Sequence, residues 1–157
     1  MLPPGRLYEI NNTMASAITA GRTLIHVTAG AANPLYILEA HVEGESATSL
    51  QMEVEIAKVT TAGSPVGTGT TTTIPRGHAA AASFTAIGSL STEPTAYSAT
   101  AIAEKHFRSS VYGYHFEPVM PGLWLPIPAG EIWGLRLLTA SVASQKFSSS
   151  LLVLELG

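Results

Sequence analysis

The chain has 157 residues, a formal net charge of −3 and a sequence pI near 5.9, and it contains neither cysteine nor aspartate. This weakly acidic balance provides no broad electropositive field, so nucleic acid is not an expected partner. The two missing residue types exclude disulfides, zinc–thiolate sites, a thiol nucleophile, a Ser-His-Asp triad and aspartate-based metal sites.

Charge is sparse along the chain: charged residues make up 12%, against about 25% in typical soluble domains. The longest apolar stretches, Leu35–Leu38 and Leu151–Leu154, are far shorter than the roughly 20 residues of a membrane-spanning helix, so no membrane partner is expected. The N-terminal residues show no secretory signal. Sparse charge favours a surface that neighbouring subunits cover; an exposed neutral coat of Thr, Ser and Ala is the alternative.

The first segment, Met1–Asn12, has two prolines and few core-forming residues. It is expected to be an arm that docks on a neighbour, or a disordered tail. Its candidate partner-binding residues are Leu2, Pro3, Pro4 and Arg6. The next segment, Asn12–Ala20, is expected to be a connection, with at most one helical turn capped by Asn12 or Thr13.

Alternating apolar residues predict a pair of neighbouring strands. Leu50, Met52, Val54 and Ile56 alternate with polar residues, which predicts a strand with Glu53 and Glu55 on a solvated face. The preceding Tyr36–Glu43 segment begins apolar on both faces and becomes one-sided toward its end. Further strand candidates, rich in β-branched, aromatic or alternating apolar residues, are Arg22–Thr28, Tyr97–Ala103, Val111–Phe116, Glu131–Thr139 and Ser149–Leu156.

A low-complexity insert, Thr60–Pro75, is rich in Thr and Gly and contains no charged residue. Two interpretations remain open: a mobile surface loop, or an arm that adds a strand to an exposed sheet edge. The candidate partner-binding residues of the insert are Thr70, Thr71, Thr72 and Thr73. The Ala-rich His78–Phe84 segment that follows is expected to be strand or loop.

Short strands separated by Gly, Pro, Ser and Thr clusters, with no alternating helices, predict the fold class. We expect an all-β protein, a two-sheet antiparallel β-sandwich that is jelly-roll-like, in a single domain over residues 1–157. Each half-solvated sheet must bury its apolar face on the other sheet.

The sequence contains no pattern typical of catalysis or cofactor binding. The five histidines, His26, His41, His78, His106 and His115, lack the local spacing of a zinc module. His41 with Glu39 or Glu43 is the nearest approach to a ligand pair, and the histidine cluster that opens a cupin metal site is absent. Gly67-Thr68-Gly69 lacks the third glycine of a phosphate loop. No catalytic, cofactor-binding or metal-binding residue is therefore predicted, and the chain is not expected to be an enzyme.

Aromatic residues gather in the C-terminal half: Tyr112, Tyr114, Phe116, Trp124 and Trp133. Tyr112, Tyr114 and the Leu123–Leu125 stretch are expected to fill a core. Exposed aromatic side chains would instead suggest sugar stacking.

The stretch from Pro121 to Leu137 predicts a strand that ends at a Pro-x-Pro turn, a reversal at Ala129-Gly130 and a new strand. This stretch resembles the small jelly-roll-like proteins of tailed-phage virions known as capsid decoration or cement proteins. The order of the Val27–Asn33 stretch, the strand pair, the Thr/Gly/Pro-rich loop and the final Leu151–Glu155 strand is also similar.

The resemblance implies a structural subunit on the outer capsid surface of a virion. Such a protein binds the major capsid protein and itself, here with a trimer favoured, and stabilises the head without a cofactor. The Ala79–Ala82 segment and the low charge depart from the group. The alternative function is a carbohydrate-binding β-sandwich module of a phage fibre or extracellular protein, with Trp124 or Tyr114 as the stacking platform.

Overall fold

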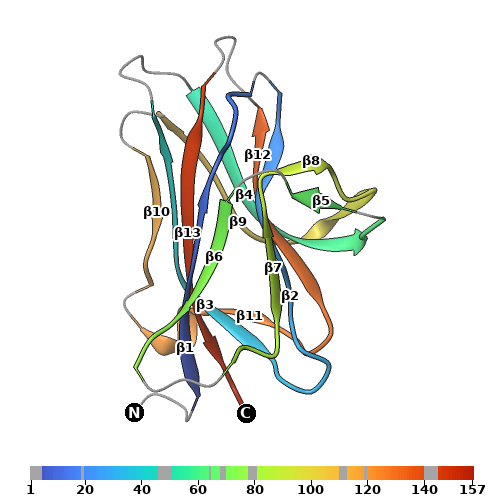
Figure 1. Ribbon diagram of the computed structural model, residues 1–157, viewed down its shortest axis with the longest axis vertical. Helices are drawn as coiled ribbons and strands as arrows, with labels where there is room; N and C mark the ends of the chain where they lie inside the picture. Colours follow the sequence, from blue (N-terminus) through green and yellow to red (C-terminus); the bar gives the residue numbers. More distant parts are fainter. Residues whose placement is uncertain are drawn as a thin grey trace.

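In the computed structural model, the described residues are 5–18, 20–45, 51–63, 65–67, 70–77, 81–109, 113–118, 120–139 and 145–157. They form two main antiparallel sheets that pack face to face (Figure 1). The first sheet has the order β10-β3-β13-β1-β6, and β11 also pairs with β3. Its strands are β1 (Arg6–Thr13), β3 (Leu35–Gly44), β6 (Thr70–Pro75), β10 (Tyr114–Phe116), β11 (Leu125–Ile127) and β13 (Phe147–Glu155).

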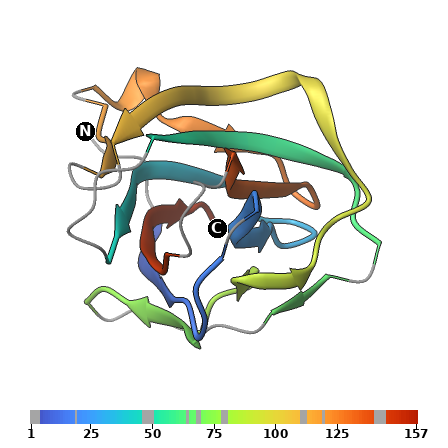
Figure 2. The same cartoon turned by 90° about the horizontal axis from the view of Figure 1, so that it is seen from above.

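The second sheet has the order β7-β2-β12-β4-β9. Its strands are β2 (Arg22–Thr28), β4 (Gln51–Thr61), β7 (Thr85–Gly88), β9 (Ala96–Ser109) and β12 (Ile132–Thr139). A separate two-stranded sheet joins β5 (Val66–Gly67) to β8 (Leu90–Thr92), and the 3-10 turn η1 (Pro121–Leu123) precedes β11. Seen from above, β9 and β4 cross one side of the molecule, and β1 and β6 lie on the opposite side (Figure 2).

The strand order is that of a jelly roll. From β1 to β4 each strand lies in the sheet opposite to its predecessor. β9 lies next to β4 in the second sheet, after which β10 returns to the first sheet, β12 to the second and β13 to the first. The first and last strands are therefore neighbours, with Arg6 opposite Glu155 and Thr13 opposite Ser148. The predicted all-β, two-sheet sandwich is confirmed. β6 and β7 extend the two sheets by one strand each.

The core lies between the two sheets and follows the two-residue alternation of the strands. Met52, Val54 and Ile56 of β4 all face it, as the sequence predicts. Other buried members from the first sheet include Tyr8, Ile10, Ile37, Val42, Leu151 and Val153. Phe84 belongs to this core and packs edge-on against Tyr8, with ring centroids 5.2 Å apart. Its segment, residues 81–84, forms no strand.

The N-terminal segment corrects the expectation of an arm. Arg6–Thr13 is a full strand, paired with β13 on one side and β6 on the other, and Tyr8 and Ile10 are buried. A strand in this sheet contributes only every second side chain to the core, so the few apolar residues of this segment are enough for it to pack on the second sheet. Asn12 and Thr13 belong to this strand and cap no helix. Met1–Pro4 lie outside the described residues.

Glu53 and Glu55 also correct an expectation. Both were predicted on a solvated face, yet they are 8% and 2% exposed. Their side chains do point away from the core, but that outer face is covered: Arg136 of the neighbouring strand β12 forms an ion pair with Glu55. Alternation assigns a residue to a face, and it does not say whether another group lies over that face.

The turn predicted after Pro121–Leu125 is confirmed. β11 ends at Ile127, the Glu131 amide donates to the Pro128 carbonyl at 3.1 Å, and β12 begins at Ile132. Gly130 has φ of +74°, a conformation that favours glycine, which explains the Ala-Gly pair. Leu123 was expected in the core and is instead 54% exposed.

Candidate partner-binding face

The outward side of the first sheet presents a band of polar side chains, here called the polar face. Strand register aligns one row of it across five strands: His115 of β10, His41 of β3, Ser150 of β13, Asn11 of β1 and Thr72 of β6. Further outward residues are Glu9, Thr13, Glu39, Glu43 and Ser148. All of these are at least partly exposed, because the opposite side of the same strands makes the core.

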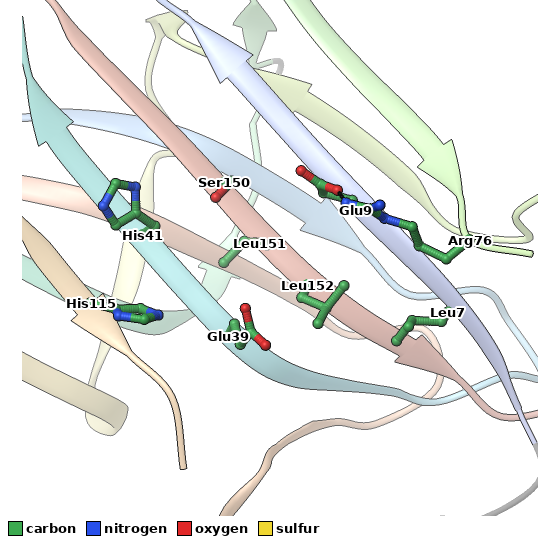
Figure 3. Close-up of a pocket in the computed structure, with 9 residues that line it drawn as sticks. All are labelled: Leu7, Glu9, Glu39, His41, Arg76, His115, Ser150, Leu151 and Leu152. Atoms are coloured by element: carbon green, nitrogen blue, oxygen red, sulfur yellow. Dashed lines mark ion pairs between the residues drawn. The ribbon is translucent and has the colours of Figure 1, made fainter. Parts of the chain in front are cut away.

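A trough of about 420 Å³ crosses the polar face. Figure 3 shows Glu39, His41 and His115 on one side of it and Glu9 with Arg76 on the other, with β13 between them. The two imidazoles meet edge-on, with ring centroids 5.8 Å apart. Arg76, just after β6, forms an ion pair with Glu9.

A second hollow of about 300 Å³ adjoins the trough and shares His41 and Ser150 with it. Its other lining residues are Asn11, Asn12, Thr13, Ser148 and Ser149. Hydroxyl, amide and imidazole groups both donate and accept hydrogen bonds. The second hollow therefore suits a polar, uncharged partner surface or ligand, whereas the trough also presents Glu39 and the Glu9–Arg76 pair.

An aromatic pair lies next to the polar face. Tyr36 points outward from β3, the strand that also holds Glu39 and His41, and its ring meets Trp124 edge-on with centroids 6.4 Å apart. Tyr114, the other predicted stacking residue, is 2% exposed and belongs to the core. Of the two, only Trp124 is accessible to a ligand. Tyr112 lies outside the described residues.

The predicted partner-binding residues fall in two places. Arg6 begins β1, is exposed and stands opposite Glu155, whereas Leu2, Pro3 and Pro4 lie outside the described residues. Thr70, Thr71, Thr72 and Thr73 form most of β6, and Thr72 is the end of the central row of the polar face. The Thr-rich insert thus adds a strand to this chain's own first sheet.

The outer side of the second sheet holds a cluster that the sequence did not reveal. The Arg136 guanidinium contacts Glu55 and lies 3.7 Å from the centre of the Tyr97 ring. The Glu93 carboxylate accepts hydrogen bonds from the Thr23 amide at 3.0 and 3.1 Å, and the Thr23 hydroxyl contacts Tyr97. Burial raises the pKa of Tyr97 to about 12, so the phenol stays protonated.

Gly134 makes this cluster possible. A Cβ at this position would lie 2.6 Å from the Tyr97 hydroxyl, so a larger residue would displace the ring from β12. The cluster groups are mostly occupied with one another: Glu55 with Arg136, Arg136 with Tyr97, and Glu93 with Thr23. These contacts favour a structural role for the cluster over a role in ligand binding.

His26 is buried, and its pKa lies below the usual value of histidine. Burial lowers this pKa because it penalises the imidazolium. His41 and His115 lie on the polar face, whereas His78 falls outside the described residues and only the backbone of His106 is described.

Within the described ranges, no group of three or more His, Cys, Asp or Glu side chains could hold a metal ion. Glu39 and His41 both line the trough. No helix in the described part of the chain is long and apolar enough to cross a membrane.

The chain was compared with protein-family models, with curated proteins and with solved structures, and none of them matches it.

Proposed function

We propose that this protein is a capsid decoration subunit, which binds the outer surface of an icosahedral phage head and stabilises it without chemistry. The observation that supports this function best is the central row of the polar face, which crosses five strands of the jelly roll and contains no carboxylate, ammonium or guanidinium group. The centres of protein interfaces are depleted in charge, so such a face can be buried on a partner at low desolvation cost. The resemblance of the Pro121–Leu137 stretch directs the proposal to the major capsid protein.

The electrostatics of the face agree with this use. Glu9 already has a cationic partner in Arg76, so covering it does not leave an unpaired carboxylate. Glu39 and Glu43 lie on either side of the central row and are not part of it. Ser150, Asn11 and Thr72 in the central row are uncharged groups that both donate and accept hydrogen bonds. A surface of this kind gains binding energy from area and shape, and it needs no bound cofactor.

The test is co-sedimentation with heads assembled from the major capsid protein of its own virus. We expect the wild-type protein to bind and to raise the temperature at which the heads open. Ser150→Lys, which places a charge at the centre of the polar face, should weaken binding at least about tenfold, equivalent to about 1.4 kcal/mol. Thr100→Lys, at an exposed position of strand β9 in the second sheet, is the matched control and should bind as wild type. Failure of the wild type to bind, or equal binding by Ser150→Lys, would contradict the proposal.

A second candidate function is saccharide binding by the same face. It is favoured by the trough of about 420 Å³ and by the Tyr36–Trp124 pair next to it, since an aromatic ring beside hydrogen-bonding side chains suits the two faces of a sugar.

Titration with a panel of soluble oligosaccharides, followed by tryptophan fluorescence, distinguishes this candidate. Saccharide binding predicts a saturable change that Trp124→Phe removes and Trp133→Phe keeps, because Trp133 packs on the core and donates a hydrogen bond to Glu131. No change across the panel, or a change that survives Trp124→Phe, would exclude Trp124 as a sugar platform.

A further inference from the structure

The two sheets of the sandwich end in edge strands, and all but one of these are protected against pairing with another chain. β10 and β11 have three residues each, and β7 has four. β9 is long, but its sequence includes Glu104, Lys105 and Arg108, and its register shifts three times along β4. Short length, charge and irregularity are the usual means by which proteins prevent edge-to-edge association.

The remaining edge strand, β6, has little of this protection. It runs for six residues, Thr70–Pro75, and pairs on one side only, in regular register with β1. No charged residue occurs from position 59 to position 75, and the next cation, Arg76, is paired with Glu9. Pro75 removes one backbone donor at the end of the strand. Thr72 and Thr73 are exposed, and among the described residues the only backbone ladder that β6 forms is the one with β1.

We propose that the free edge of β6 is a self-association site, where it pairs antiparallel with β6 of a second copy about a two-fold axis. Four consecutive threonines make the strand self-complementary, because any antiparallel register near its centre places Thr opposite Thr. Cross-strand Thr pairs are favourable, and no like charges oppose each other. Ile74, which is 45% exposed on this strand, adds apolar surface to the contact.

The choice of a second copy follows from the strand lengths. A head-to-tail ring would require β6 to pair with one of the other edges, which are either too short to match its six residues or charged and irregular. An edge that pairs with its own copy gives an isologous interface, which closes at two subunits. The structure thus favours a dimer through β6, in place of the trimer that the resemblance implies.

Light scattering after size exclusion, over a dilution series, tests the inference. Wild type should have twice the chain mass of 16.4 kDa. Thr72→Lys brings two like charges together near the two-fold axis and should shift the mass to one chain at every concentration, with an unchanged far-UV circular dichroism spectrum. Thr100→Lys, the same substitution on the protected edge strand β9, should remain dimeric. A wild-type monomer, a trimer, or a Thr72→Lys dimer would overturn the proposal.

The inference rests on the proposed function only for the biological use of the dimer, and the two fail separately. If the protein is a dimer but does not bind heads, the proposed β6 contact stands and the proposed decoration role is wrong. If the protein is a monomer that binds heads through the polar face, the proposed β6 contact is wrong and the proposed decoration role stands.

Discussion

At the scale of single residues, the Glu55–Arg136 pair shows how an acidic side chain is tolerated on a covered face. Glu55 is 2% exposed, and the Arg136 Nε donates to its Oε1 at 2.9 Å. A buried ion pair costs desolvation, which its attraction offsets only when the geometry and further contacts are good. Here the guanidinium also stacks on Tyr97, and this contact holds it in place.

Arg136→Met tests this account, because methionine keeps much of the packing volume and removes the charge and the donors. We expect it to lower the free energy of unfolding by about 2–3 kcal/mol, measured by urea denaturation. Lys58→Met is the control: it breaks the more exposed Lys58–Glu131 pair, with side chains 34% and 25% exposed, and should cost less than about 1 kcal/mol. Equal losses in the two variants would show that burial of the Glu55 pair is not the decisive factor.

At the scale of elements, Asn12 joins strands of the first sheet to the turn between β7 and β8. It is 2% exposed, and its amide donates to the Ser89 hydroxyl at 3.0 Å and to the Ser149 hydroxyl of β13 at 3.3 Å. Ser89 has φ of +48°, an uncommon value for a residue with a side chain. The network therefore helps to hold a strained turn against the opposite sheet.

Asn12→Ala removes these hydrogen bonds and should lower the free energy of unfolding by about 1–3 kcal/mol. Asn11→Ala is matched in strand and chemistry, but its side chain faces outward, and it should change stability by less than about 0.5 kcal/mol. Chemical denaturation of both variants provides the comparison. If the two losses are equal, Asn12 does not fasten the sheets together.

At the scale of the whole molecule, the jelly-roll order separates two kinds of outer surface. The outer side of the second sheet is partly occupied by its own groups, with Glu53 and Glu55 buried and Arg136 lying over Glu55 and Tyr97. The polar face of the first sheet is open, and the uncharged edge of β6 borders it. The proposed binding to a shell and the proposed pairing of β6 would thus use adjoining parts of one side of the sandwich.

The sequence by itself determined the fold class and much of the strand content. Two-residue alternation predicted the Met52–Ile56 face, β2 matches its predicted bounds, and the Pro-x-Pro and Ala-Gly pair predicted the β11–β12 turn. These features are local, because side-chain alternation and turn conformation depend on residues a few positions apart.

The tertiary structure alone decided which strands are neighbours and which faces are covered. The composition of residues 6–12 predicts an arm. In the structure these residues form a strand inside the first sheet, because they pair with β13 from the far end of the chain. The row from His115 to Thr72 joins five strands that are distant in sequence, and the burial of Glu55 depends on Arg136, 81 positions away. Such contacts arise when the sheets pair and pack, so no local pattern specifies them.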